Sequence, residues 1–552
     1  MTISAARGIA RILKAEGTEW VSTFPVCCVN NALGDEGVRM IMMRDERYAV
    51  AVADAFSRVM GGKKIGVCTV MGGLNPAGLQ MAYGALAQAY EDSSPVLCIA
   101  DGVPPSDRGG RRYDITDGFR AVTKWIGHIN QPQRVPEFMR RAFTQLRSGR
   151  PGPVLITVPS TLGDYEEGAH PYTPVKGWKS APDPHDVKNA VRALREAENP
   201  LLYVGEGVYY ADAVEELHRF AELAQMPVLT TLKAKSIFPE NHPLSIGVRG
   251  QVATHFLKTC DLVFAVGTSL GRGHFRQTIP NAEEKVIVQC TVDTADINNR
   301  YRVDHAVIGD AAFTLQGLID ELEETGGLPR NEALIAEIAT AKEAMMERYR
   351  PLMESTDKPI NPYRVYKALQ EMLDPQNSFL THDSGNTRDQ LSTVYEALSP
   401  RSFMGWGDVS TLGFGLAAAM AAKLAHPEWQ CVNVTGDAGV GYMLGNMEAL
   451  VRQNIGVTTV HINNGGFSGY GPGFWGQGHD PYTCEVSDHE VTNMAETVGG
   501  LGYYAETVGE PSEIIPALER AFAQNAEGQP AFLEMLCSQY PVFGDWVSEE
   551  EH

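Results

Sequence analysis

The sequence predicts an α/β protein built from three doubly wound parallel-sheet domains. The chain has 552 residues, which is too long for one ordinary core and fits about three domains of typical size. Short apolar runs rich in β-branched residues alternate with stretches of helical periodicity, as they do in repeated β-α-β units. Many of the apolar runs end in a glycine turn, which indicates a strand entering a crossover.

Composition narrows the range of partners. The chain carries 46 basic and 68 acidic residues and a formal net charge of −22, which argues against nucleic acid or an anionic membrane surface as a partner. The opening segment is charged and amphipathic, and no apolar run reaches the roughly 18 residues that a membrane span needs. We therefore expect a cytoplasmic protein without a signal sequence.

Cysteine usage indicates neither a disulfide framework nor a zinc site. The nine cysteines are scattered and form no C-x-x-C motif. Cys27 and Cys28 are the one adjacent pair. Such a pair is usually two small buried residues, but a redox or nucleophilic role stays open because the pair lies near the loop where we expect the substrate.

The first expected domain covers residues 1–165. Its predicted strands lie in KIGVCTVMG, SSPVLCIADG and GPVLITVP, and helical patterns separate them. Residues 166–186 are dense in proline, glycine and charge, which is typical of a surface linker.

The second expected domain covers residues 187–325, with predicted strands in PLLYVG, PVLTT, LVFAVG, KVIVQCTVD and HAVIG. Gly205 and Gly207 follow the first of these strands and suggest a nucleotide-binding turn. Tyr210, however, stands where the dinucleotide pattern requires Gly or Ala. FAD or ADP in this domain is conceivable and is not predicted.

A charged, alanine-rich helix over residues 332–350 connects to the third expected domain, residues 358–537. The last residues, 538–552, form an acidic tail, which is usually solvated and could alternatively cover an active site.

The third domain contains the most informative stretch, VTGDAGVGYMLGNMEALVRQNIGVTTVHINNGG. Residues 431–435 read as a buried strand, residues 442–454 as a helix, and residues 457–462 as a second strand, which together form a β-α-β unit. The turns after both strands then meet at the carboxyl edge of one parallel sheet, where open α/β sheets bind ligands.

This arrangement brings Asp437 close to Asn464. A carboxylate and an amide oxygen are ligands suited to Mg²⁺ or Ca²⁺, and the backbone N–H groups of Ala438 and Gly439 at a helix start suit a phosphate. The stretch therefore predicts a metal-bound diphosphate. In the plainer interpretation, Asp437 only caps the helix and the Asn-Asn-Gly-Gly segment is only a turn.

The spacing of GDA, a helix, a strand and NN resembles the metal-diphosphate motif of the thiamine-diphosphate-dependent enzyme family. The family usually has glycine where this chain has Ala438. The resemblance extends over nearly the whole chain and implies a pyrimidine-binding domain, a central Rossmann-like domain and a diphosphate-binding domain, in that order. Acetolactate synthase, oxalyl-CoA decarboxylase and 2-hydroxyacyl-CoA lyase share this order.

In the first domain, RDERYAVAVADAFSRVMGGKKIGVCTV resembles the family segment that carries the activating glutamate, here Glu46. The chemistry requires a buried, proton-sharing carboxylate, because the aminopyrimidine of the cofactor must pass through its imino tautomer before it can accept the thiazolium proton.

The remaining site residues are implied by resemblance in the third domain. SFMGWGDVSTLGFG resembles the stretch that bends the cofactor, with Leu412 between its rings and the backbone at Ser410 against the aminopyrimidine. The resemblance places a second group near the diphosphate, namely Ser384, Gly385, Asn386, Gly436, Asp437, Ala438, Gly439 and Asn464. It gives the metal ligands as Asp437, Asn464 and the carbonyl oxygen of Gly466.

The reaction implied by the resemblance is carbon–carbon bond cleavage through a thiazolium carbanion and an enamine. The favoured substrate is a 2-hydroxyacyl-CoA or a related 2-oxo acyl compound. This choice rests on Ala438 and on the third-domain segments SGNTRDQLSTVYEALSPRSFMGWGDVSTLGFG and INNGGFSGY, which resemble acyl-CoA-using members. CoA phosphates would need cations, and the middle domain offers Lys233, Lys235, Arg249, Arg272 and Arg276.

Two alternatives stay open. One is an acetolactate-synthase-like or 2-oxo acid decarboxylase and carboligase activity on free 2-oxo acids. The histidine pair of simple decarboxylases is absent from the first domain, where Tyr113, Asp114 and Phe119 occupy the corresponding region. The other is a non-catalytic, cofactor-binding regulatory homologue. The family also implies thiamine diphosphate, Mg²⁺ or Ca²⁺, and a homodimer or homotetramer with sites between chains.

Overall fold

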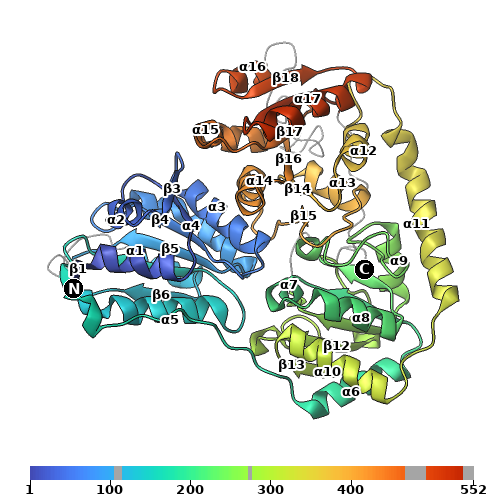
Figure 1. The fold of residues 1–552 in the computed structure, drawn as a ribbon. Coiled ribbons are helices and arrows are strands. Elements are labelled where there is room, and N and C mark those ends of the chain that lie inside the picture. Colours follow the sequence, from blue (N-terminus) through green and yellow to red (C-terminus); the bar gives the residue numbers. More distant parts are fainter. Residues whose placement is uncertain (105–114, 272–275, 467–492, 539–552) are drawn as a thin grey trace, which may run out of the picture. The chain divides into compact units, whose positions relative to one another are not determined.

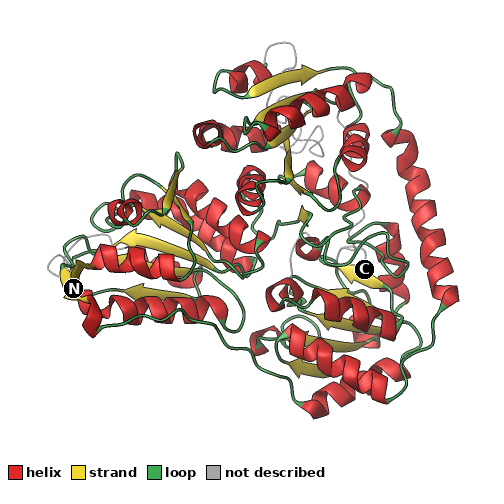
Figure 2. Ribbon diagram, in the orientation of Figure 1, coloured by secondary structure: helices red, strands yellow, loops and turns green. Residues whose placement is uncertain are grey.

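The computed structural model describes residues 1–104, 115–271, 276–466 and 493–538. By contacts the chain divides into two compact units. The first contains residues 1–179, 408–427 and 443–454, and the second contains residues 180–407, 428–442 and 455–552. Each unit is an α/β structure in which helices flank parallel strands (Figures 1 and 2).

The first unit contains a six-stranded parallel sheet with the strand order β3-β2-β4-β5-β7-β6. Its strands are β2 (Trp20–Thr23), β3 (Arg39–Met42), β4 (Gly66–Val70), β5 (Val96–Asp101), β6 (Trp125–His128) and β7 (Val154–Val158). Its helices are α1 (Ala5–Ala15), α2 (Asn30–Asp35), α3 (Glu46–Val59), α4 (Ala77–Glu91), α5 (Val135–Arg147) and, from later in the chain, α14 (Phe414–Ala425). β1 (Thr2–Ser4) pairs antiparallel with β8 (Asp164–Glu166).

The second unit contains two parallel sheets. The middle sheet has the order β10-β9-β11-β12-β13, with β9 (Pro200–Val204), β10 (Val228–Thr230), β11 (Leu262–Val266), β12 (Val286–Thr291) and β13 (His305–Ile308). Its helices are α6 (Pro184–Glu196), α7 (Gly207–Ala211), α8 (Val214–Ala224), α9 (Gln251–Thr259) and α10 (Ala311–Glu324). The long helix α11 (Glu332–Met353) then leads to the last sheet.

The last sheet has the order β15-β14-β16-β17-β19-β18. Its strands are β14 (Ser378–His382), β15 (Phe403–Met404), β16 (Gln430–Gly436), β17 (Thr458–Asn463), β18 (Tyr504–Val508) and β19 (Ala531–Leu536). Its helices are α12 (Pro362–Met372), α13 (Asn386–Val394), α15 (Asp437–Gln453), α16 (Met494–Gly499) and α17 (Ile514–Ala526).

The first and last sheets have the same strand order when their strands are numbered along the chain. In both, the second strand lies on one side of the first strand and the third strand lies on the other side. The direction of winding therefore reverses between β2 and β4 in one sheet and between β14 and β16 in the other. Open α/β sheets bind ligands outside the carboxyl ends of the strands at such reversals.

The predicted α/β class with three parallel sheets is confirmed. The structure adds strands that the sequence interpretation did not single out, namely β1, β2, β3, β6, β8, β14, β15, β18 and β19. The turn expected after the strand at residues 431–435 is absent, because α15 begins directly at Asp437. The expected linker is mostly irregular, but β8 pairs with the N-terminal strand at residues 164–166.

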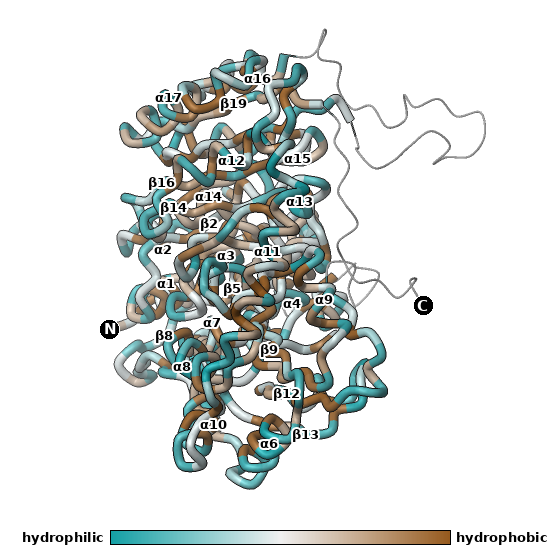
Figure 3. Tube along the Cα trace, turned by 90° about the vertical axis from the view of Figure 1, so that its right-hand side faces the viewer, coloured by the Kyte–Doolittle hydropathy of each residue, from teal (hydrophilic) through white to brown (hydrophobic). Residues whose placement is uncertain are grey.

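The central strands of the sheets are buried on both faces, so they carry continuous apolar runs instead of an alternating pattern. All residues of β4, β7, β11, β14 and β17 are buried. Figure 3 shows the result along the chain, with hydrophobic stretches alternating with the hydrophilic helices and turns that border them. Among the described residues, no helix is long and apolar enough to cross a membrane. The acidic tail lies outside the described residues, apart from Ser538.

Candidate active site

Glu46 is the first residue of α3, directly after β3 at the carboxyl edge of the first sheet. The carboxylate of Asp45 accepts a hydrogen bond from the backbone N–H of Tyr48 at 2.8 Å, which caps the helix and fixes where it begins. Glu46 is only 5 % exposed. A carboxylate at this depth is unusual for a helix terminus and is a functional candidate on physical grounds.

A neighbouring glycine makes room for this carboxyl group. A Cβ atom at Gly78 of α4 would lie 2.2 Å from Oε1 of Glu46 and 2.8 Å from the carbonyl oxygen of Met71. Only glycine can occupy that position without moving Glu46 or the turn after β4. The contact between α3 and α4 therefore fixes where the Glu46 carboxyl lies.

Burial raises the pKa of Glu46, the backbone hydrogen bond of Glu46 itself opposes part of this effect, and the negative charge of Asp45 adds a smaller increase. Desolvation penalises the charged form, so the carboxyl holds a proton more readily than an exposed glutamate does. A carboxyl of raised pKa can share a proton with a basic partner, which is the chemistry expected of Glu46.

The segment carrying Ser410 and Leu412 belongs to the same unit. Ser410 has φ +60°, a left-handed conformation that costs a non-glycine residue energy. The backbone N–H of Thr411 donates to Oε1 of Gln88 on α4 at 3.0 Å, and the hydroxyl of Tyr48 donates to the carbonyl oxygen of Gly413. Side chains of α3 and α4 thus hold this strained segment.

In the second unit, three parallel strands end side by side, because β16 pairs with both β14 and β17. Asp437 follows β16 and Asn464 follows β17, in a register that pairs Gly436 with Ile462. The structure therefore brings Asp437 and Asn464 to adjacent positions at one edge, as the sequence predicts. Ser384 follows β14 at the same edge.

Asp437 is nearly buried, with 4 % of its side chain exposed. Its Oδ1 lies 3.2 Å from Nε2 of His461, a residue of β17 whose side chain is 1 % exposed. Sequence reasoning did not single out His461, although a polar residue inside the apolar run of β17 was a usable signal. The imidazole therefore helps to orient the carboxylate of Asp437.

Asp383 is a second residue that sequence reasoning did not single out. It is buried directly after β14, and its Oδ1 accepts a hydrogen bond from the N–H of Ser384 at 2.8 Å. A Cβ atom at Gly439 would lie 2.9 Å from Oδ1 of Asp383 and 2.2 Å from Oγ1 of Thr435. Gly439 therefore lets the first turn of α15 approach the end of β14.

Two features of this edge suit an anion. The N-terminus of α13 follows β14 and that of α15 follows β16, and these two strands are paired. Gly385, which precedes α13, has φ +97°. Aligned N–H groups at a helix start attract phosphate. An added Cβ at Gly385 or at Gly436 would meet nothing within 4 Å, so both positions border open space.

Two side-chain hydrogen bonds stabilise the turn after β17. Oδ1 of Asn464 accepts a hydrogen bond from the N–H of Gly466 at 3.4 Å, and Oδ1 of Asn463 accepts one from the N–H of Gly465 at 3.2 Å. The plainer interpretation of a turn is thus correct for the local structure. It does not exclude ligation, because an amide oxygen has a second lone pair.

The residues at this edge fit a divalent cation with a diphosphate. The donors are a carboxylate, an amide oxygen and a backbone carbonyl oxygen, which is a hard oxygen set of the kind that Mg²⁺ prefers. The open space beside Gly385 and Gly436 leaves room for the anion.

Three of the middle-domain cations form ion pairs with carboxylates. Lys235 lies 2.5 Å from Oε2 of Glu240, with 1 % of its side chain exposed, and Nη1 of Arg249 lies 3.1 Å from Oδ1 of Asp389. The other pair joins Lys233 to Glu206 at 2.6 Å. Each of the three therefore pairs with a carboxylate within its own unit, and their binding of a CoA ester stays a prediction. Arg276 donates to Ser269, and Arg272 lies outside the described residues.

The glycine turn after β9 has a packing role. A Cβ at Gly205 would lie 2.3 Å from the carbonyl oxygen of Gly267, and one at Gly207 would lie 2.8 Å from its Cα. The two glycines allow the turns after β9 and β11 to touch. The helix that follows, α7, spans only Gly207–Ala211, which is short for a nucleotide-binding helix.

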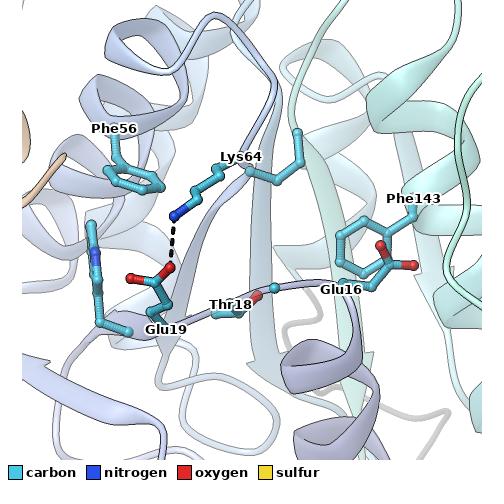
Figure 4. A pocket seen from close by; sticks show the side chains of 9 residues that line it. Glu16, Thr18, Glu19, Phe56, Lys64 and Phe143 are labelled. Atoms are coloured by element: carbon cyan, nitrogen blue, oxygen red, sulfur yellow. Dashed lines mark hydrogen bonds and ion pairs between the residues drawn. The ribbon is translucent and has the colours of Figure 1, made fainter.

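The region compared with the histidine pair of decarboxylases is only partly described, since Tyr113 and Asp114 lie outside the described residues. Phe119 is fully buried, with its ring centroid 5.1 Å from that of Tyr83. A hollow in the first unit is unrelated to the candidate site. It is lined by Glu19 and Lys64, which pair at 2.6 Å, at the amino ends of β2 and β4 (Figure 4).

Comparison with known proteins agrees with this geometry. Three family models of thiamine pyrophosphate enzymes match the chain: the N-terminal TPP-binding domain over residues 3–128, the central domain over 187–318 and the C-terminal TPP-binding domain over 383–535. A probable acetolactate synthase large subunit of Methanocaldococcus jannaschii is 31 % identical, over 97 % of this chain and 92 % of the relative. The glyoxylate carboligase of Escherichia coli O157:H7 is 27 % identical, over 95 % and 91 %. The chain therefore belongs to the thiamine-diphosphate-dependent enzyme family and is an enzyme of its decarboxylase and carboligase type.

Proposed function

We propose that this enzyme decarboxylates a free 2-oxo acid and joins the remaining acyl carbon to the carbonyl carbon of a second molecule. The relatives named acetolactate synthase and glyoxylate carboligase support this proposal, because they align with nearly the full length of the chain. It was the alternative interpretation of the sequence. The single observation that carries it is full-length similarity combined with an intact Glu46.

Cleavage of a 2-hydroxyacyl-CoA, the favoured interpretation of the sequence, is the weaker proposal. The phosphates of a CoA ester would need cations, and three of the middle-domain candidates pair with carboxylates. A phosphate would have to displace the buried carboxylate of Glu240 from Lys235 or the partly buried carboxylate of Asp389 from Arg249. Ala438 and the third-domain segments that resemble acyl-CoA-using members remain the features that favour an acyl-CoA substrate.

The residues of this chain have separate roles in the proposed reaction. Thiamine diphosphate, when bound, supplies the carbanion that attacks the carbonyl carbon of the substrate. The buried carboxyl of Glu46 would hold and exchange a proton with the aminopyrimidine, and Leu412 would keep the cofactor bent. Asp437, Asn464 and Gly466 would hold Mg²⁺, and the amide groups at the starts of α13 and α15 would hold the diphosphate.

The proposed enzyme is an assembly of two or four copies of the chain. The first unit exposes large apolar side chains in the loops after β2 and β4 and on α4: Val26 is 51 % exposed, and Leu74 and Met81 are each 53 % exposed. Such side chains are often covered in an assembly. This observation supports a homodimer or homotetramer.

The test is a substrate panel. The purified chain, supplied with thiamine diphosphate and Mg²⁺, is incubated with pyruvate, with glyoxylate, with both together, and with 2-hydroxyacyl-CoA esters. The proposal predicts CO₂ release and a ligated product, identified by NMR, from one or more of the 2-oxo acid incubations and no cleavage of the thioesters. Cleavage of thioesters alone would refute it in favour of the lyase. A sample stripped of divalent metal with a chelator should be inactive and recover when Mg²⁺ is restored.

A further inference from the structure

A cluster of three acidic ligands at the carboxyl edge of the first sheet has no part in the proposed reaction. Cys27 and Cys28 lie in the loop after β2, and Asp101 is the last residue of β5. One ligand atom from each of these residues lies within 4.8 Å of the other two. The cluster therefore has the spacing of a metal site.

Local contacts hold the cluster together. The backbone N–H of Cys28 donates to Oδ1 of Asp101 at 2.8 Å, and Sγ of Cys28 lies 3.4 Å from the carbonyl oxygen of Val158 on β7. Sγ of Cys27 lies 3.9 Å from the carbonyl oxygen of Ile99 on β5. Cys27 is buried, whereas Cys28 is half-buried and can be reached from solvent.

A short series of contacts connects the cluster to Glu46. An added Cβ at Gly72, in the turn after β4, would lie 2.6 Å from the carbonyl oxygen of Asp101. The residue before it, Met71, borders Gly78, which itself borders Glu46. The loops after β2 and β4 flank the point where the winding of this sheet reverses, so the cluster lies where the sheet is expected to bind ligands.

The chemistry of the cluster favours a soft cation. Burial and the neighbouring thiol of Cys27 raise the pKa of Cys28, and burial raises the pKa of Asp101. Three acidic groups packed together repel one another once ionised, and a divalent cation removes that repulsion. Two sulfur ligands select Zn²⁺ or Cd²⁺ over Mg²⁺, which prefers the oxygen ligands at Asp437.

We propose that Cys27, Cys28 and Asp101 bind one thiophilic divalent cation, such as Zn²⁺ or Cd²⁺, and that its binding inhibits the enzyme. Zinc–sulfur bonds of about 2.3 Å in a tetrahedral site require the two sulfur atoms to be about 3.8 Å apart. The sulfur atoms therefore need at most a modest movement. The half-exposed side of Cys28 leaves the fourth position to water. Binding releases the two thiol protons to solvent as both thiolates coordinate the metal.

Direct binding is measured with Cd²⁺, because thiolate coordination produces a charge-transfer absorption in the ultraviolet that does not depend on turnover. The full chain, saturated with thiamine diphosphate and Mg²⁺ and kept reduced with a phosphine, is titrated with Cd²⁺. We expect one Cd²⁺ per chain. Cys28→Ser and Asp101→Asn should each weaken the affinity by roughly tenfold or more, since both remove a direct ligand.

Cys260→Ser is the matched control. Cys260 is a buried cysteine in the second unit, remote in sequence from the cluster and beside Lys285. Cd²⁺ absorption should be the same in this variant as in the unmodified chain. No absorption in the unmodified chain, or equal absorption in Cys28→Ser, would overturn the proposed site.

Inhibition is the second measurement, and it rests on the proposed function. Cd²⁺ at the concentration that fills the site should abolish turnover of the unmodified chain and of Cys260→Ser, while Cys28→Ala retains more activity at that concentration. Binding without loss of turnover would overturn the inhibitory role. If no 2-oxo acid is turned over at all, the proposed function fails, and the absorption titration still decides whether the cation site exists.

Discussion

The carboxyl group of Glu46 depends on a residue in a different helix. Gly78 leaves the space into which Glu46 extends, at 2.2 Å from where a Cβ would lie. Sequence similarity identified Glu46, but the requirement for glycine at position 78 is a property of the contact between α3 and α4. No local pattern encodes it.

Gly78→Ala tests this dependence. The added methyl group would displace the Glu46 carboxyl or the turn at Met71, so we expect turnover to fall at least about tenfold, since misplacing a catalytic group by about 1 Å can cost about a hundredfold. Gly84→Ala is the control on the same helix, because nothing lies within 4 Å of its Cβ position. That variant should keep full activity and gain about 0.5–1 kcal/mol in free energy of unfolding. Equal activity in the two variants would contradict the role of Gly78.

We expect Glu46→Gln to lose activity and, as the pH rises, to become more stable relative to the parent chain. The folded pKa of Glu46 is raised above the unfolded value of about 4.5, so its contribution to stability is full below that value and is lost as pH rises through the folded pKa. Glutamine does not titrate. In the chain without cofactor, the melting temperature of the variant relative to the parent should therefore rise as the pH increases above about 4.5. A difference that is constant with pH would contradict the raised pKa.

At the scale of elements, the last sheet positions its ligands by ending adjacent strands in different ways. β16 passes directly into α15 at Asp437, β14 ends just before the buried Asp383, and β17 ends in a turn. The sequence predicted both strands of the β-α-β unit and the proximity of Asp437 to Asn464. It did not predict Asp383 or His461 as neighbours, because strand order decides which buried polar residues meet.

Gly439→Ala tests the approach of α15 to β14. Its Cβ would lie 2.2 Å from Thr435 and 2.9 Å from Asp383, so the first turn of α15 would have to move. We expect the thermal stabilisation given by thiamine diphosphate with Mg²⁺ to be largely lost. Gly441→Ala, two residues further along α15, has no neighbour within 4 Å and should respond to the cofactor like the parent chain. Equal stabilisation of both variants would contradict this account of the turn.

Strands were easier to predict from the sequence than the contacts that side chains make after folding. The apolar runs of β4, β7, β11 and β17 are buried throughout and are recognisable from sequence. β15 has only two residues and β3 is partly exposed, so neither has a clear pattern. The ion pairs of Lys235 and Arg249 were not predicted, because nothing in the local sequence shows that Glu240 and Asp389 lie beside them.

At the scale of the whole molecule, the residues of the proposed site come from two sheets with the same strand order. The first carries the buried carboxyl group of Glu46, whose pKa is raised, and the last carries the oxygen ligands and helix starts suited to a metal diphosphate. The middle sheet has another order, and its glycine turn serves packing. Family membership was predictable from sequence, whereas the choice of substrate was not, because it depends on which charges remain unpaired after folding.

Exchange of the thiazolium C2 proton of bound thiamine diphosphate for deuterium tests the central claim most directly, because it needs no knowledge of the substrate. NMR of quenched samples would compare the parent chain with Glu46→Gln, both saturated with the cofactor and Mg²⁺. The account predicts exchange that is fast in the parent and slower by about a hundredfold or more in the variant, with cofactor binding largely retained. Equally fast exchange in both proteins would contradict the assignment of Glu46 as the activating carboxyl.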